Sequence, residues 1–99
     1  MLAYIEWIPW HLGGRMSPPS GIGSPPYSTI VRFADSSDPR PPHDGWSLVI
    51  EKVNSCATLY EWIADVRYLV EEAPQCNLIQ GREFELYEGK KCVARGRIL

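Results

Sequence analysis

Several features that would point to a function are scarce or missing in this sequence of 99 residues. It has only three cysteines, Cys56, Cys76 and Cys92, and their odd number and wide spacing fit neither a disulfide framework nor a Cys-x-x-Cys metal site. Because free thiols are typical of a reducing compartment, we expect a cytoplasmic protein. No apolar run approaches the roughly 20 residues of a membrane-spanning helix, and no signal peptide is visible, so we expect no membrane association.

Catalytic and cofactor motifs are also missing. No GxxxxGK[ST] loop is present, so we expect no nucleotide binding. The two histidines, His11 and His43, lack further ligands at the spacing that a metal site needs, and no signature pairs a cysteine with a histidine for nucleophilic catalysis. Ten basic against twelve acidic residues give a net charge of −2, which excludes a generally basic nucleic-acid binder but not a local basic patch. The sequence therefore predicts no metal, no cofactor and no catalytic residues.

What the sequence does contain is typical of a small all-β domain. Nine prolines and eight glycines cluster in residues 13–26 and 35–45, and short apolar runs lie between such clusters. We expect six strands within residues 2–8, 27–33, 46–53, 58–73, 82–87 and 91–99, the last two joined by a tight turn at Glu88, Gly89 and Lys90. Closure into a barrel removes exposed strand edges. The sequence therefore predicts one domain over residues 1–99, an all-β, six-stranded, antiparallel closed β-barrel.

Alternation along these runs predicts which side chains face the core. One face of each run carries mainly apolar residues, and the residues expected to share these faces are Ala3, Ile5, Trp7, Tyr27, Thr29, Val31, Phe33, Trp46, Leu48, Ile50, Phe84, Leu86, Cys92, Ala94, Gly96 and Ile98. The small residues Ala94 and Gly96 suit a crowded barrel interior. We expect the core to take two or three of the four tryptophans.

Residues 58–73 fit two templates. Helical spacing of apolar residues and the capping-box pattern of Thr58 and Glu61 favour a helix. Read as a strand, the same segment places Trp62, Val66 and Val70 on one face. The pattern alone slightly favours the helix.

A family resemblance bears on this choice. The chain resembles the C-terminal β-barrel of elongation factor Tu, and the motifs stand in the same order as in that barrel: Gly13-Gly14-Arg15, Ser17-Pro18, Gly21, Pro25, Arg32 to Asp35, Gly81, Phe84, Glu88-Gly89 and Ala94 to Gly96. The resemblance implies a six-stranded antiparallel barrel in which residues 58–73 form a strand rather than a helix. It covers nearly the whole chain, with an insertion near residues 54–61. It implies no GTPase activity, because the nucleotide-binding domain of the factor has no counterpart here.

The loop after the first strand holds the leading candidate contact site. Trp10 stands where a strand passes into a loop, beside His11 and ahead of Arg15. Tryptophan and arginine are enriched at interface hot spots. We therefore expect a non-catalytic module that binds another macromolecule, in the first instance a protein, through Trp10, His11 and Arg15 in the loop of residues 10–26.

Glycine and arginine residues of this loop support a contact role, but Arg15 also has a second interpretation. Gly13 and Gly14 would let the backbone approach a partner closely. Arg15 offers a planar donor fork to a partner's carboxylate or phosphate. Alternatively, Arg15 pairs with an acidic residue of its own chain, such as Asp35, and fastens the loop to the barrel, and this structural role is the one we favour.

An alternative function is RNA binding through the C-terminal hairpin. In elongation factor Tu the resembling turn contacts the T stem of tRNA, which implies a role for Glu88 and Gly89 here. The basic neighbours Lys90, Lys91 and Arg95 would add phosphate contacts, which are salt-dependent and blind to base sequence. A third hypothesis is a small enzyme with a site at the barrel mouth. We expect a monomer.

Overall fold

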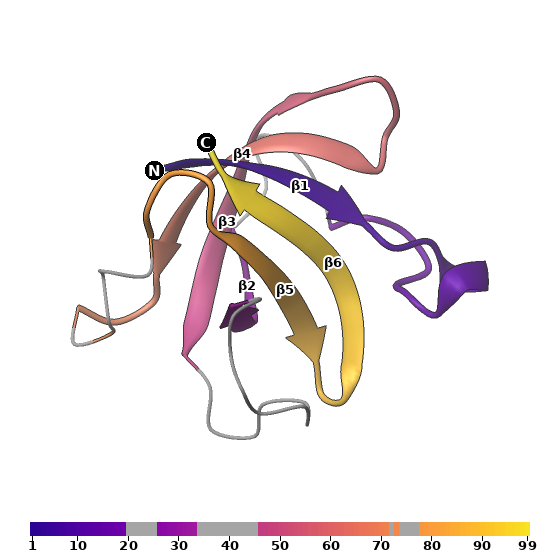
Figure 1. The fold of residues 1–99 in the computed structure, drawn as a ribbon. Coiled ribbons are helices and arrows are strands. Elements are labelled where there is room, and N and C mark those ends of the chain that lie inside the picture. Colours follow the sequence, from indigo (N-terminus) through magenta and orange to yellow (C-terminus); the bar gives the residue numbers. More distant parts are fainter. Residues whose placement is uncertain (20–25, 34–45, 72, 74–77) are drawn as a thin grey trace.

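The strands of the structure, a computed structural model that describes residues 1–19, 26–33, 46–71, 73 and 78–99, form one closed barrel. The elements are β1 (Leu2–Trp7), the short 3-10 helix η1 (Trp10–Leu12), β2 (Tyr27–Phe33), β3 (Ser47–Ser55), β4 (Glu61–Tyr68), β5 (Glu83–Glu88) and β6 (Lys91–Ile98). Every neighbouring pair is antiparallel, and the order around the barrel is β1-β4-β3-β2-β5-β6 (Figure 1). The predicted six-stranded antiparallel closed barrel is confirmed.

The ambiguous segment forms strand β4. It pairs with β1 on one side and with β3 on the other, and Trp62, Ala64, Val66 and Tyr68 are buried. Backbone hydrogen bonds on both sides outweigh the helical preference of the sequence, because a helix over these residues would break the hydrogen bonds that β4 makes with both β1 and β3. Val70, predicted on the same face, is exposed because the strand ends at Tyr68.

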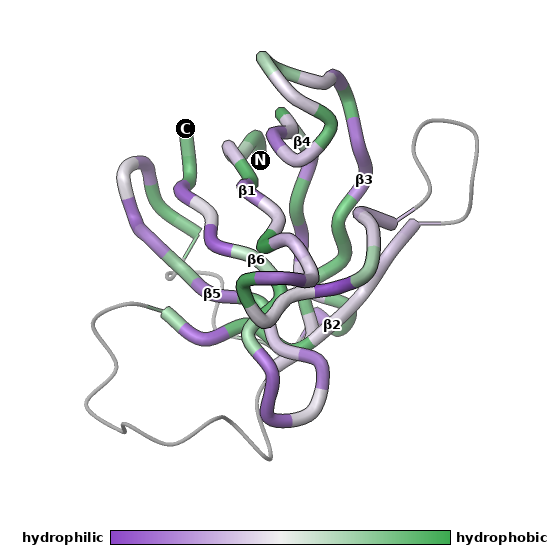
Figure 2. The backbone as a smooth tube through the Cα atoms, turned by 90° about the vertical axis from the view of Figure 1, so that its right-hand side faces the viewer, coloured by the Kyte–Doolittle hydropathy of each residue, from purple (hydrophilic) through white to green (hydrophobic). Residues whose placement is uncertain are grey.

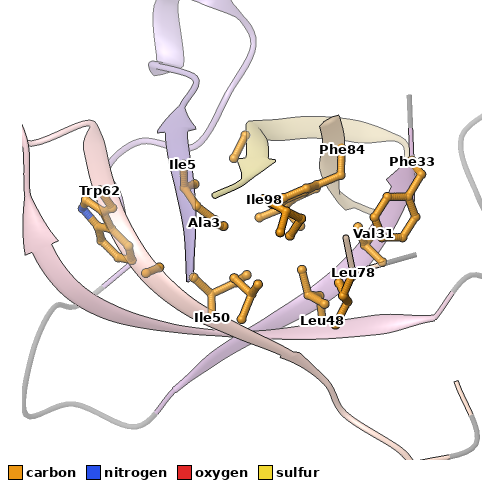
Figure 3. Close-up of a cluster of buried hydrophobic side chains, with 14 of the residues drawn as sticks. Ala3, Ile5, Val31, Phe33, Leu48, Ile50, Trp62, Leu78, Phe84 and Ile98 are labelled. Carbon is orange, nitrogen blue, oxygen red and sulfur yellow. The ribbon is translucent and has the colours of Figure 1, made fainter. Parts of the chain in front are cut away.

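The hydrophobic core occupies the interior of the barrel. Its buried residues come from all six strands and from Ala73 and Leu78, and Figure 3 shows Ile5, Trp62 and Phe84 turned toward the same interior space. The indole of Trp7 meets the rings of Tyr27 and Trp62 edge to face, with centroids 5.5 and 5.0 Å away. Trp7 and Trp62 are thus in the core, which agrees in number with the predicted two or three tryptophans. Trp46, which alternation placed on the face of Leu48 and Ile50, is instead 44% exposed because it precedes β3, at the end of the barrel. Along the strands hydrophobic residues alternate with hydrophilic ones, as a barrel with a single core requires (Figure 2).

Strand β6 has two irregular features. One is a β-bulge at Val93, and the other is a close contact between Gly96 and the Phe84 ring. The register with β5 shifts between Leu86, opposite Ala94, and Tyr87, opposite Cys92, so Val93 is an extra residue in a β-bulge. Val93 and Ala94 are consequently both buried, whereas alternation predicted an outward Val93, and Cys92 is only half-buried. Gly96 packs under the Phe84 ring, and a Cβ there would lie 2.3 Å from Phe84 Cζ.

Among the described residues the only helix is η1, which is much too short to cross a membrane. Residues 54–61, where we expected an insertion relative to elongation factor Tu, contain the end of β3 and the turn into β4. This turn and the segment that contains η1 both project beyond the end of β1, on the right in Figure 1.

Candidate interaction surface

Residues 8–17, here called the η1 segment, fold back on the end of β1. Pro9 begins the helix, and its carbonyl accepts hydrogen bonds from the backbone N–H groups of Leu12, at 3.0 Å, and Gly14, at 2.9 Å. Gly13 ends the helix with φ at 93°, a left-handed conformation that glycine adopts without strain. Arg15 then forms an isolated bridge to Pro9. These contacts within residues 9–15 hold the backbone of the η1 segment in one conformation.

Gly14 serves this folding back rather than an approach to a partner. It is buried, and a Cβ at this position would lie 1.6 Å from the carbonyl oxygen of Ile8. A side chain of any size therefore collides with the backbone at the end of β1. The expectation that Gly13 and Gly14 let a partner approach gives way to an intramolecular role for Gly14.

Arg15 ties the η1 segment to the β5–β6 hairpin. Its Nη1 donates to a carboxylate oxygen of Glu88, and the hydroxyl of Tyr27 donates to the same oxygen. The Arg15 Nε donates to the Ser17 carbonyl at 3.1 Å, and the guanidinium lies 5.1 Å from the centre of the Tyr27 ring. The structural interpretation of Arg15 fits this geometry, with Glu88 as the partner, and Asp35 lies outside the described residues.

The contacts with Glu88 shift the pKa values of Tyr27 and Arg15. Burial and the hydrogen bond to Glu88 raise the pKa of Tyr27 to about 12. Burial alone would lower the pKa of Arg15, but the hydrogen bond and negative charge of Glu88 outweigh it, and the pKa is raised. At neutral pH the phenol is therefore a donor and the guanidinium a cation, which is the combination that Glu88 can accept.

The two groups of residues singled out from the sequence meet on one side of the barrel. Lys91 Nζ lies 5.3 Å from the centre of the Trp10 ring, and Arg15 binds Glu88. His11 is exposed in η1 beside Trp10. Because the η1 segment lies against the hairpin, the expected protein-contact site and the expected RNA-contact hairpin are neighbouring parts of one surface.

The hairpin carries less free positive charge than its sequence indicates. Gly89, with φ at 63°, and Lys90 form the exposed turn, and Glu88 is occupied by Arg15. Arg95 lies farther along β6, opposite a glutamate on each side. Opposite charges directly across a sheet partly neutralise each other. Of the five residues expected to contact RNA, Lys90 and Lys91 are the cations near the turn.

Three large apolar side chains of the η1 segment are exposed to solvent. The exposed fractions are 62% for Trp10, 68% for Leu12 and 80% for Met16. Trp10 was predicted from the sequence as a contact residue, whereas Leu12 and Met16 were not. The signal was the presence of large apolar residues within a loop otherwise rich in glycine and proline. Single exposed apolar residues are ordinary, but three on one short segment that internal bonds hold in place favour a contact role.

Among the described residues we looked for the groups that a metal site or a nucleophilic cysteine would need. No group of three or more His, Cys, Asp and Glu side chains among them is placed to hold a metal ion. Burial and the nearby Glu85 raise the pKa of the Cys92 thiol to about 11, so it is protonated at neutral pH and a poor nucleophile. His43 and Cys76 lie outside the described residues.

Comparison with known proteins adds no assignment. No protein family, no curated protein and no solved structure matches this chain. The resemblance to the C-terminal barrel of elongation factor Tu therefore stays a prediction, and the case for any function rests on the geometry of the barrel and the η1 segment.

Proposed function

We propose that this barrel is a non-catalytic binding module that contacts another protein through the η1 segment, with Trp10 at the centre of the contact. The observation that carries the proposal is the exposure of Trp10 on a segment that Gly14, Arg15 and Glu88 hold against the barrel. A surface that is ordered before binding loses less conformational entropy when a partner docks. Tryptophan supplies a large apolar area with few rotatable bonds.

The partner that fits is a protein segment with an apolar side chain next to an acidic one. The apolar side chain would cover Trp10, whose ring has Lys91 as its neighbour on the hairpin side. Lys90 and Lys91 are both exposed there and would attract a carboxylate. His11, beside Trp10, lies at the margin of the same contact.

The RNA alternative is less well supported. Lys90 and Lys91 would give few phosphate contacts, because Arg95 lies between Glu6 and Glu85 in the sheet and Arg15 is bound to Glu88. Binding of RNA would lose affinity steeply with salt, whereas a contact centred on Trp10 would lose little.

Affinity capture with matched variants tests the proposal. We would immobilise the chain, the Trp10→Ser variant and the Leu59→Ser control, and identify bound proteins from cytoplasm before and after ribonuclease treatment. Leu59 is a suitable control because it is 74% exposed and lies in the β3–β4 turn. We expect a protein retained by wild type and by the control, lost with Trp10→Ser, and insensitive to ribonuclease.

Two outcomes would contradict the proposal. Equal capture by the Trp10→Ser variant would show that the η1 segment is not the contact. Loss of capture after ribonuclease, together with release of tRNA by moderate salt, would favour the RNA alternative.

A further inference from the structure

A cleft of about 550 Å³ opens between the end of β1, the η1 segment and the β3–β4 turn. Its apolar and aromatic lining consists of Trp7, Ile8, Pro9, Leu12 and Tyr60. Its charged lining consists of Glu6, Glu61 and Arg95. A concave apolar wall with a few convergent polar groups is the usual form of a ligand site.

The two carboxylates are direct neighbours in the sheet. Glu6 of β1 and Glu61 of β4 stand opposite each other in the register. Like charges in this position repel, and a cation placed between them removes the repulsion. The arrangement therefore favours a positively charged ligand over a neutral or negative one.

The surrounding residues leave this negative charge incompletely balanced. Arg95, which also lines the cleft, stands opposite Glu6, but Glu85 stands on its other side. Arg32 of β2 in turn stands opposite Glu85. The row across β4, β1, β6, β5 and β2 therefore holds three carboxylates and two guanidiniums, and the excess negative charge lies at the end where Glu61 stands opposite Glu6. Tyr4 Oη donates to Glu61 Oε2 at 2.6 Å, which orients the carboxylate without adding charge. That hydrogen bond, with burial and the charge of Glu61, raises the pKa of Tyr4 to about 12, so the phenol stays a neutral donor.

We propose that this cleft binds an alkyl ammonium or alkyl guanidinium group, with the cation between Glu6 and Glu61 and the alkyl stem against Ile8, Pro9 and Leu12. A guanidinium offers planar paired donors that match carboxylates, and an ammonium offers a compact charge. The source of the group is either a free amine or the side chain of an arginine or lysine in another protein. The proposal goes beyond the contact at Trp10 and does not depend on it, because Trp10 does not line the cleft.

An NMR titration of the full chain tests the charge requirement. The probes are n-butylguanidinium and the neutral n-butylurea, which has the same stem. We expect the cation to shift the backbone amides of Ile8, Tyr60 and Glu61 in a saturable manner, and butylurea to shift them little. Equal shifts from both compounds would overturn the proposal.

A matched pair of variants tests the carboxylates. Glu6 stands between the like charge of Glu61 and the opposite charge of Arg95, so the two effects of Glu6→Gln on stability offset each other and the variant should fold normally. We expect Glu6→Gln to weaken butylguanidinium binding by about tenfold or more, because the glutamine amide keeps one acceptor oxygen but lacks the negative charge that strengthens a hydrogen bond to a cation. Glu83→Gln, an exposed glutamate outside this cleft, should bind as wild type does. Unchanged binding by Glu6→Gln would overturn the proposal.

Two further titrations identify the source and separate the two proposals. Arginine capped as N-acetyl-arginine methylamide carries peptide groups on both sides of the residue. If it binds as well as butylguanidinium, the cleft accepts a protein side chain, and if only butylguanidinium binds, the cleft takes a free amine. Either result keeps the cation site. Trp10→Ser should bind butylguanidinium normally, so failure of the contact at Trp10 and failure of the cation site are distinguishable.

Discussion

Replacing Arg15 with alanine tests whether the η1 segment is held by the pairing seen in the structure. The change removes a charged hydrogen bond to Glu88, the contact with the Tyr27 ring and the bond to the Ser17 carbonyl. Arg15 and Glu88 are both partly buried, so the pair is worth more than an exposed one and less than a fully buried one. The charged hydrogen bond contributes about 1–2 kcal/mol at this exposure, and the ring contact adds about 0.5–1 kcal/mol.

The expected loss in free energy of unfolding is therefore about 1.5–3 kcal/mol. For a domain of this size, 1 kcal/mol lowers Tm by roughly 4–8 °C, so thermal unfolding followed by circular dichroism resolves the effect. Arg67→Ala is the matched control, because Arg67 is exposed and pairs with Glu51 at 3.5 Å, so it should cost no more than about 0.5 kcal/mol. A Tm for Arg15→Ala equal to that of the Arg67 control would refute the structural role, and folded Arg15→Ala should still bind the partner.

Three further predictions concern the packing of the core and the pH dependence of the free energy of unfolding. Phe84→Ala and Val31→Ala should lower the free energy of unfolding by roughly 3–5 and 2–4 kcal/mol in urea denaturation, because both side chains are buried, and near-neutral values would mean that they face outward. Gly96→Ala should cost about 1–3 kcal/mol, because its Cβ overlaps the buried Phe84 ring, and an unchanged denaturation midpoint would contradict that packing. The free energy of unfolding should fall between about pH 10 and 12, because the phenol of Tyr27 ionises in the unfolded state near 10.0 but in the folded state near 12. Tyr27→Phe should show a smaller fall over this range, and an identical pH profile for the two proteins would contradict the assignment.

The barrel could be predicted from the sequence because strands and tight turns depend on residues that are close together in the chain. Alternation in β1 and β5 identifies Ile5 and Phe84 as inward, since successive side chains of a strand point to opposite faces. The Gly89 turn follows from the residues that a tight hairpin accepts. Closure follows because six short strands would otherwise leave exposed edges.

The remaining features depend on contacts between distant residues. The partner of Arg15 is Glu88, 73 residues further along the chain, and no local rule selects it among twelve acidic residues. The bulge that buries Val93 arises from the register between two strands, which alternation within β6 does not contain. The cleft beside Glu6 requires the β3–β4 turn to meet the end of β1, which only the closed barrel provides.

The most direct test of the account is photo-cross-linking from position 10 inside the cell. A chain with benzoylphenylalanine in place of Trp10 keeps an exposed aromatic group at the centre of the proposed contact, and a second chain with the same group in place of Leu59 serves as the control. We expect a discrete protein adduct from position 10 that is absent from position 59 and resistant to ribonuclease. Identical adducts from the two positions, or none from position 10, would contradict it.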